Sequence, residues 1–198
     1  VTPQFLLEGM LYALEQCGRL LRGAVALYRT GDYSTAILLA AFAREELGKS
    51  RILRGIRGEV LGGKSFTVED LKDKVRRGKD IHIRKQNAGH LSVVQRASED
   101  SELGRLLRAR HENHPHSAEY RAAAKRLDEI TDEQRRNEPA ERHNLRMRCL
   151  YVEADDAGTT WNRPCSQTPG TAHDFLIDAA NDYRGQYDRF QDGNIAIE

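Results

Sequence analysis

The strongest constraint on the fold is an apolar stripe near the N-terminus that repeats at intervals of three and four residues. Its members are Leu6, Met10, Ala13, Cys17, Leu20, Ala24 and Leu27. Such spacing places side chains on one face of an α-helix, whereas a half-buried strand would alternate at every second residue. The stripe therefore predicts an amphipathic helix from about Pro3 to Tyr28 with one face against a core.

A short turn signal follows this helix. Gly31 is free to take a positive φ, and Asp32 is placed to cap the N-terminus of a second helix. That helix is expected from about Tyr33 to Arg57, because apolar residues again recur at helical spacing, at Ala36, Leu39, Ala40, Ala43 and Leu47. So short a connection predicts an antiparallel helical hairpin over residues 1–57.

Helical patterns continue through the rest of the chain. The expected helices run over Val68–Ala97 with a break near Gly78 or Gly89, around Leu103–Arg108, over Ala118–Ile130, from Pro139 onward, and over Thr171–Phe190. The segment from Asp155 to Gly170 reads as irregular. No stretch alternates as a strand would, and there is no repeat of about 20–50 residues. The sequence therefore predicts an all-α, antiparallel bundle of five to seven helices, forming one domain over residues 1–198.

Charge is distributed unevenly along the chain. Residues 44–110 contain 17 Lys or Arg against 10 Asp or Glu, whereas residues 153–198 contain 3 against 9 and form an acidic C-terminal extension that includes the final helix. A basic middle and an acidic end are compatible with nucleic-acid binding or with self-association, and solvated helix faces are the plainer alternative.

The sequence also bounds the compartment and the cofactors. It has no apolar run of about 18 residues and no basic segment followed by an apolar stretch at the N-terminus, which predicts a cytoplasmic protein. The three cysteines, Cys17, Cys149 and Cys165, are far apart and lack CxxC spacing. The histidine-rich stretch from His111 to His116 lacks HExxH spacing, so no metal and no cofactor is expected.

Several motifs resemble those of the AbiV-type abortive-infection proteins, which belong to the HEPN superfamily. In the hairpin, Gly31-Asp32-Tyr33-x2-Ala36 leads into Glu45-Glu46-Leu47-Gly48-Lys49, and Glu45-x3-Lys49 is similar to the ExxxK element of HEPN domains. The segment His82-Ile83-Arg84-Lys85 resembles the family's HKxK segment, with Ile83 in place of Lys. The segment 146–153, followed by Trp161 and Pro164, resembles an LYVD…W…P block, with Glu153 in place of Asp.

This resemblance implies an antiphage effector that blocks translation. Such a protein would act as a metal-independent endoribonuclease or by binding a translation component, as a homodimer with its cleft at the two-fold axis. Its partners would be RNA or the translation machinery, with a phage protein as an activator and no membrane. HEPN ribonucleases carry Arg-x4–6-His with a polar residue after the Arg, and Arg136-Asn137 with His143 fits this pattern. His143 would then be a general base on a ribose 2′-hydroxyl, and Arg136 would hold the phosphate.

His82 is a rival for the catalytic role. The same Arg–His spacing occurs by chance elsewhere, for example between Arg77 and His82. His82 and Lys85 share a helix face and are expected to meet Glu45 or Glu46 in a buried polar cluster, which is more often structural than catalytic. Further supporting residues of the expected site are Lys49, Asn137, Arg146 and Tyr151.

Plainer interpretations accompany each of these residues. Glu45 and Lys49 are four residues apart and can form an ordinary surface ion pair. Arg142 and His143 can cover the acidic neighbours Glu138 and Glu141, and Trp161 is expected to be a packing anchor. Two alternative functions follow: a non-catalytic helical module that binds a protein or RNA, and a sensor that binds a nucleotide or another small ligand in a cleft between helices.

Overall fold

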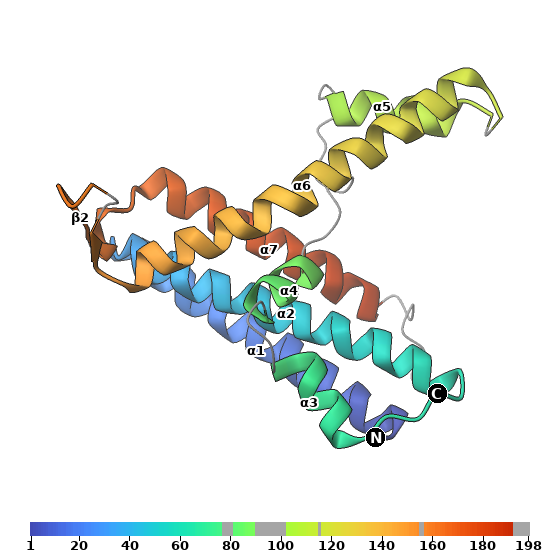
Figure 1. Ribbon diagram of the computed structural model, residues 1–198, viewed down its shortest axis with the longest axis horizontal. Helices are drawn as coiled ribbons and strands as arrows, with labels where there is room; N and C mark the ends of the chain where they lie inside the picture. Colours follow the sequence, from blue (N-terminus) through green and yellow to red (C-terminus); the bar gives the residue numbers. More distant parts are fainter. Residues whose placement is uncertain (77–80, 90–101, 115, 155–156, 192–198) are drawn as a thin grey trace. The chain divides into compact units, whose positions relative to one another are not determined.

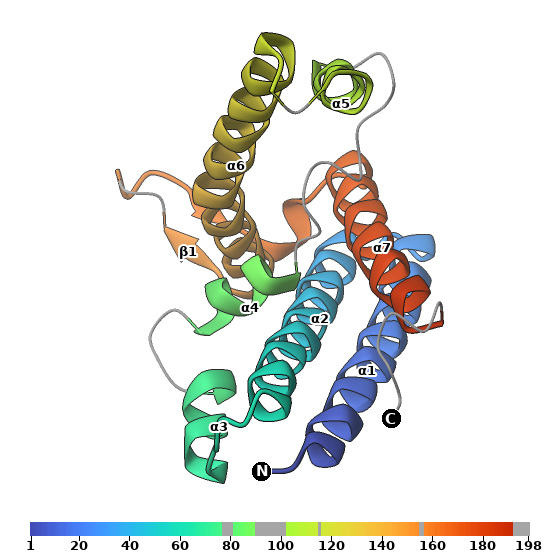
Figure 2. The ribbon, with the colours of Figure 1, turned by 90° about the vertical axis from the view of Figure 1, so that its right-hand side faces the viewer.

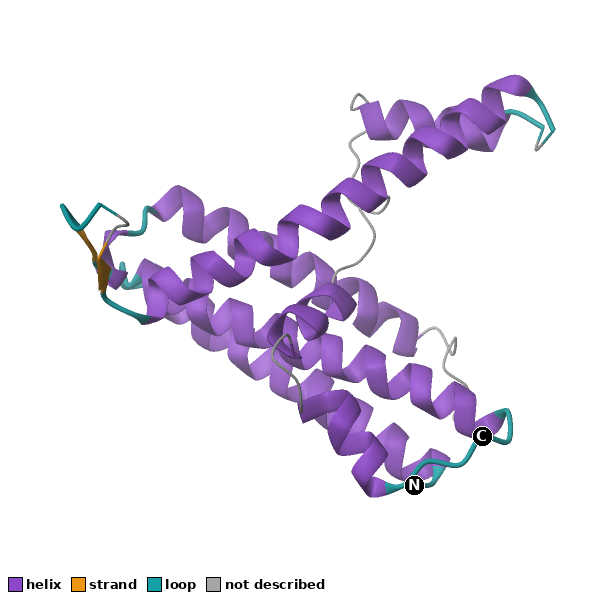
Figure 3. Cartoon of the chain, in the orientation of Figure 1, coloured by secondary structure: helices purple, strands orange, loops and turns teal. Residues whose placement is uncertain are grey.

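Helices make up almost all of the described chain (Figure 3). The computed structural model describes residues 1–198 except 77–80, 90–101, 115, 155–156 and 192–198. Its helices are α1 (Pro3–Arg29), α2 (Tyr33–Leu61), α3 (Val68–Arg76), α4 (Ile81–Gly89), α5 (Glu102–Glu112), α6 (Ala118–Leu150), the 3-10 turn η2 (Pro164–Ser166) and α7 (Pro169–Gln191). The strands β1 (Glu153–Ala154) and β2 (Trp161–Asn162) form one short antiparallel pair. The predicted all-α class is confirmed.

The first two helices form the predicted hairpin (Figure 1). Pro3 lies in the first turn of α1, and the hydroxyl of Thr2 accepts a hydrogen bond from the backbone N–H of Phe5. At the turn, Gly31 adopts a φ of 85°, a conformation that glycine reaches without strain. The carboxylate of Asp32 then accepts a hydrogen bond of 3.2 Å from the backbone N–H of Thr35, which caps α2 as predicted.

The final helix packs against this hairpin and belongs to its core (Figure 2). Alanines on α2, including Ala36, Ala40 and Ala43, are fully buried and allow neighbouring helices to approach closely. The remaining buried residues of this core come from α1, α2, α6 and α7 and are Leu14, Cys17, Leu21, Ala24, Ile37, Ala41, Leu47, Cys149, Ala172, Phe175, Leu176 and Ala179. A second cluster of buried apolar residues packs the other end of the hairpin against α3. Its members are Leu6, Leu7, Met10, Leu53, Ile56, Phe66, Leu71 and Val75.

Two boundaries differ from those that the sequence predicted. α2 runs on to Leu61, because Gly58 stays helical and the chain turns only at Gly62 and Gly63. α6 is one helix where two were expected, so Pro139 lies inside it and does not begin a new helix. A proline inside a helix costs roughly 3 kcal/mol through a lost hydrogen bond. The flanking residues are mostly good helix formers, such as Gln, Arg and Glu, which keeps the further cost of the helix low but does not by itself offset the proline.

The chain divides into two compact units, of which the first comprises residues 1–90 and 141–198. The second, residues 91–140, contains α5 and the first part of α6. Within it, Leu103, Ala123 and Leu127 are buried, and Arg126 Nε donates a 3.0 Å hydrogen bond to Glu102 Oε1. No helix in the described ranges has the length and apolar character needed to cross a membrane.

Candidate functional site

A pair of glycines brings the short helix α4 against the middle of α2. A Cβ atom on Gly48 would lie 1.7 Å from the carbonyl oxygen of Lys85, and one on Gly89 would lie 2.5 Å from that of Arg44. Real Cβ atoms do not approach backbone oxygens so closely, so only glycine fits at either position. The two backbones therefore touch, which places the side chains of α4 next to Glu45.

His82 contacts the buried carboxylate of Glu45. The distance between His82 Nδ1 and Glu45 Oε2 is 2.7 Å, and the side chains are 42% and 8% exposed. The predicted contact of His82 with Glu45 is confirmed, but only Glu45 is buried and His82 remains partly exposed. A histidine whose Nδ1–H donates to a carboxylate has its ring fixed and presents Nε2 as a proton acceptor. The arrangement gives one anchored, accessible imidazole.

The second oxygen of Glu45 faces Arg146 and Gln86. Arg146 Nε and Gln86 Nε2 each lie 3.5 Å from Glu45 Oε1. The guanidinium of Arg146 is buried and lies 5.1 Å from the centre of the Phe42 ring. The carboxylate of Glu45 thus joins α2, α4 and α6. Arg146, which the sequence suggested only as a supporting residue, is a buried member of this cluster through its contact with Glu45.

The two histidines that the sequence offered as rivals lie side by side. The ring centroids of His82 and His143 are 6.4 Å apart, and the ring planes differ by 21°. His143 precedes Arg146 by three residues on α6, so one helix supplies both the second imidazole and the buried guanidinium. We call His82, His143, Glu45 and Arg146 the histidine-pair site.

Other predicted site residues have different positions. Arg136 and Asn137 lie in the part of α6, residues 131–140, whose side chains are outside the described ones, so the pairing of Arg136 with His143 stays a prediction. Tyr151 lies beyond the C-terminus of α6 and is exposed. The prediction that Trp161 anchors a core is wrong, because its side chain is 68% exposed on β2.

The predicted pair of Glu45 and Lys49 is replaced by another. Lys49 Nζ lies 3.0 Å from Glu46 Oε2, because Glu45 is turned toward α4 and only Glu46 shares the accessible side of α2. Lys85 is also near these carboxylates. Burial lowers the pKa of its ammonium group, and the charges of Glu45 and Glu46 oppose that shift. The net effect is a lowered pKa, which weakens the hold of Lys85 on its proton beside the histidine-pair site.

A second buried ion pair, which the sequence did not predict, joins α2 and α7. Arg44 donates hydrogen bonds of 3.1 Å and 2.8 Å to Asp182 Oδ2, and both side chains are essentially inaccessible to solvent. Arg44 also lies over the ring of Phe175, and Asp178 contacts both Arg44 and Arg142. Arg142 therefore faces Asp178 on α7, whereas the sequence had suggested that it covers its acidic neighbours Glu138 and Glu141. The spacing of Asp178 and Asp182, four apart on α7, was the available signal.

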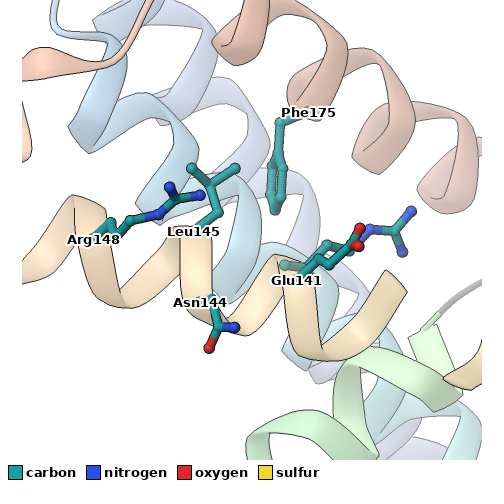
Figure 4. Close-up of a pocket in the computed structure, with 6 residues that line it drawn as sticks. Glu141, Asn144, Leu145, Arg148 and Phe175 are labelled. Atoms are coloured by element: carbon teal, nitrogen blue, oxygen red, sulfur yellow. The ribbon is translucent and has the colours of Figure 1, made fainter. Parts of the chain in front are cut away.

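A pocket of about 610 Å³ lies on a neighbouring face of α6 (Figure 4). Leu145 from α6 and Phe175 from α7 point toward one another across it, with Arg148 on one side and Glu141 on the other. Arg142 and Asn144 complete the lining. An apolar lining with a few polar groups at the rim is usual for a pocket that binds a small ligand.

The described cysteines and histidines do not supply a nucleophile or a metal centre. Burial raises the pKa of the Cys17 thiol to about 12 and that of Cys149 to about 11, so both stay protonated and unreactive. Within the described residues, no three side chains of His, Cys, Asp or Glu are grouped as metal ligands. What the described site offers is a pair of neighbouring imidazoles, of which His82 is held by Glu45.

Gly48→Ala should disrupt the site by forcing α4 away from α2. The added Cβ meets backbone, which cannot rotate aside, so we expect a loss of about 1–3 kcal/mol in the free energy of unfolding, measured with urea. Gly55→Ala is the matched control on the same helix, since its Cβ would meet nothing within 4 Å. It should stabilise the protein by about 0.5–1 kcal/mol through better helix propensity. Equal effects of both substitutions would contradict the close approach.

Comparison with known families agrees with the resemblance in the motifs. No curated protein and no solved structure matches the chain. The family model for AbiV (HEPN_AbiV) matches residues 5–184, which include all four residues of the histidine-pair site. The chain therefore belongs to the AbiV family of HEPN proteins.

Proposed function

We propose that the protein is an antiphage effector that blocks translation by cutting RNA at the histidine-pair site without a metal. Membership of the AbiV family suggests abortive-infection defence. The observation that carries the chemical part is the stacking of His82 and His143, 6.4 Å apart, with Glu45 holding Nδ1 of His82. Two adjacent imidazoles can divide the roles of general base and general acid.

The reaction would be transesterification within the RNA chain. One imidazole takes the proton of a ribose 2′-hydroxyl, and the 2′-oxygen forms a bond to the neighbouring phosphorus. The bond from phosphorus to the 5′-oxygen breaks, and the other imidazolium donates a proton to that oxygen. The products are a 2′,3′-cyclic phosphate and a 5′-hydroxyl. Glu45 would stabilise the positive charge that forms on His82. We propose Arg136 as the cation that holds the phosphate.

The wider setting of the protein follows from the same proposal. As an HEPN protein it would act as a homodimer whose cleft lies at the two-fold axis, in the cytoplasm, with a phage protein as activator. The pocket between Leu145 and Phe175 would accept a base of the RNA, because its apolar lining lies beside the exposed side chains of Asn144 and Arg148, which offer hydrogen-bonding groups.

Cleavage of RNA by the purified wild-type protein in EDTA tests this proposal. We expect total cellular RNA to be cut, with cyclic phosphate at the new 3′ ends, since no step of the reaction needs a divalent ion. The termini can be read by sensitivity to a phosphatase before and after acid opening of the cyclic phosphate. Cleavage that requires Mg²⁺, or that leaves 5′-phosphates, would contradict it.

A non-catalytic interaction module is the second candidate. The observation that favours it is the burial of Glu45 and Arg146, because a buried ion cluster can serve the fold alone. In that case the protein would halt translation in a cell-free extract while leaving its RNA uncut. This outcome separates the binding effector from the ribonuclease in the same experiment.

A further inference from the structure

A pocket of about 400 Å³ lies where α2 passes α7, and its charged lining residues are arginines. Its walls are formed by Arg51, Arg54, Gly55, Gly58 and Gln186. The four residues from α2 follow helical spacing and therefore share one face of the helix. None of them belongs to the histidine-pair site. The lining contains no carboxylate, so the pocket presents donors of hydrogen bonds and positive charge.

Gln186 carries a buried donor that lacks an acceptor among the described residues. Its side chain is fully buried, and its Oε1 accepts a 3.1 Å hydrogen bond from Arg51 Nε. That bond fixes which end of the amide is oxygen, so Nε2 is the remaining end, and it has no hydrogen-bond partner in the described structure. A buried donor without an acceptor is costly, and an oxygen of a ligand would recover that cost.

The two arginines of the pocket differ in their contacts. Arg51 is fixed in place, because a terminal nitrogen donates a 3.0 Å hydrogen bond to the carbonyl oxygen of Ala88 on α4. Arg54 lies nearly one turn further along α2 and is half-buried, and no carboxylate pairs with it in the described part of the chain. A Cβ on Gly55 or Gly58 would meet nothing within 4 Å, so the part of the lining that these glycines form is open to a ligand.

We infer that this pocket is a phosphate-binding site. A tetrahedral oxyanion offers several acceptor oxygens to one centre, which matches two guanidinium groups and a buried amide N–H. The phosphate can belong to an RNA chain or be free in solution. Arg51 follows Glu45 by six residues, about 9 Å along the axis of α2 and about 120° around it, so an RNA strand that curves around α2 could place a backbone phosphate here. Only this RNA source rests on the proposed function.

Isothermal titration calorimetry, with inorganic phosphate added to the full chain, tests the site. We expect saturable binding by the wild type. Arg54→Gln should weaken it about tenfold or more, since a charged hydrogen bond contributes roughly 1.5–3 kcal/mol. Gln186→Glu should abolish binding by repulsion while its carboxylate still accepts from Arg51. Arg22→Gln, which removes an exposed charge on α1, is the matched control and should leave the affinity unchanged.

The source of the phosphate is decided with a 2′-O-methyl RNA oligonucleotide, which cannot be cut at the 2′-oxygen. If this oligonucleotide competes with phosphate for the wild type and the competition is lost in the Arg54→Gln variant, the RNA backbone is the ligand. Phosphate binding without competition identifies a free phosphate. Absence of saturable phosphate binding, or equal weakening by Arg22→Gln and Arg54→Gln, overturns the site. These results do not depend on whether the wild type cleaves RNA, so failure of the proposed reaction is seen separately.

Discussion

Arg44→Met should lower the free energy of unfolding by about 3–5 kcal/mol. The guanidinium of Arg44 is 1% exposed and the carboxylate of Asp182 is 0% exposed, with 2.8 Å between Arg44 and Asp182 Oδ2. Methionine fills a similar volume, so packing against Phe175 is largely kept and the main change is the loss of charge. Asp182 then remains buried in the core without its arginine, which is the source of the expected loss. Urea denaturation measured by circular dichroism provides the value.

Arg19→Met is the matched control for this prediction. Arg19 and Glu15 approach within 2.6 Å, closer than Arg44 and Asp182, but their side chains are 62% and 57% exposed. Water screens such a pair, so the substitution should cost less than about 1 kcal/mol. The double substitution Arg44→Met with Asp182→Leu should recover most of the loss, because it removes both buried charges. A double variant as unstable as the single one would show that packing, and not charge, explains the effect.

The local features of the fold were predictable because they depend on neighbouring residues. Gly31 and Asp32 define the first turn by backbone freedom and by capping, and the periodic stripe defines α1 without knowledge of its partners. Pro139 shows the opposite case, since it lies within α6 although local preference favours a helix start there. Such a choice depends on how the whole helix is stabilised, which no window of the sequence contains.

The candidate site was predictable in its members but not in its arrangement. Glu45, His82 and His143 were all identified by residue type and motif, yet the two histidines were treated as alternatives. Their stacking depends on the contact of α4 with α2 through Gly48, which only the three-dimensional structure reveals. The sequence also gave no sign that Glu45, and not Glu46, would face α4. Contacts between distant segments are therefore the part that sequence patterns leave open.

The stacked histidines lead to the prediction with the largest expected effect on activity. His143→Ala should lower the rate of RNA cleavage by about 10²–10⁴-fold, because a general acid or base typically contributes that much. His82→Asn should have an effect of similar size. Its amide nitrogen can replace Nδ1 in the contact with Glu45, so the cluster stays satisfied, but it cannot accept or release a proton at this step. Single-turnover cleavage of a labelled RNA measures both rates.

Controls separate loss of chemistry from loss of structure. His173→Ala removes an exposed histidine of α7 and should leave the rate unchanged, which also excludes a contaminating nuclease if the other variants are inactive. The thermal midpoints of His82→Asn and His143→Ala should stay within a few degrees of the wild type.

If the two imidazoles act together, the double variant should be little slower than either single one, because groups that act as a unit are not additive. A pH–rate profile that is bell-shaped for the wild type and loses one limb in each single variant would assign one histidine as base and the other as acid. A His143→Ala protein that cuts as fast as the wild type would leave His82 as the sole candidate and remove the paired mechanism.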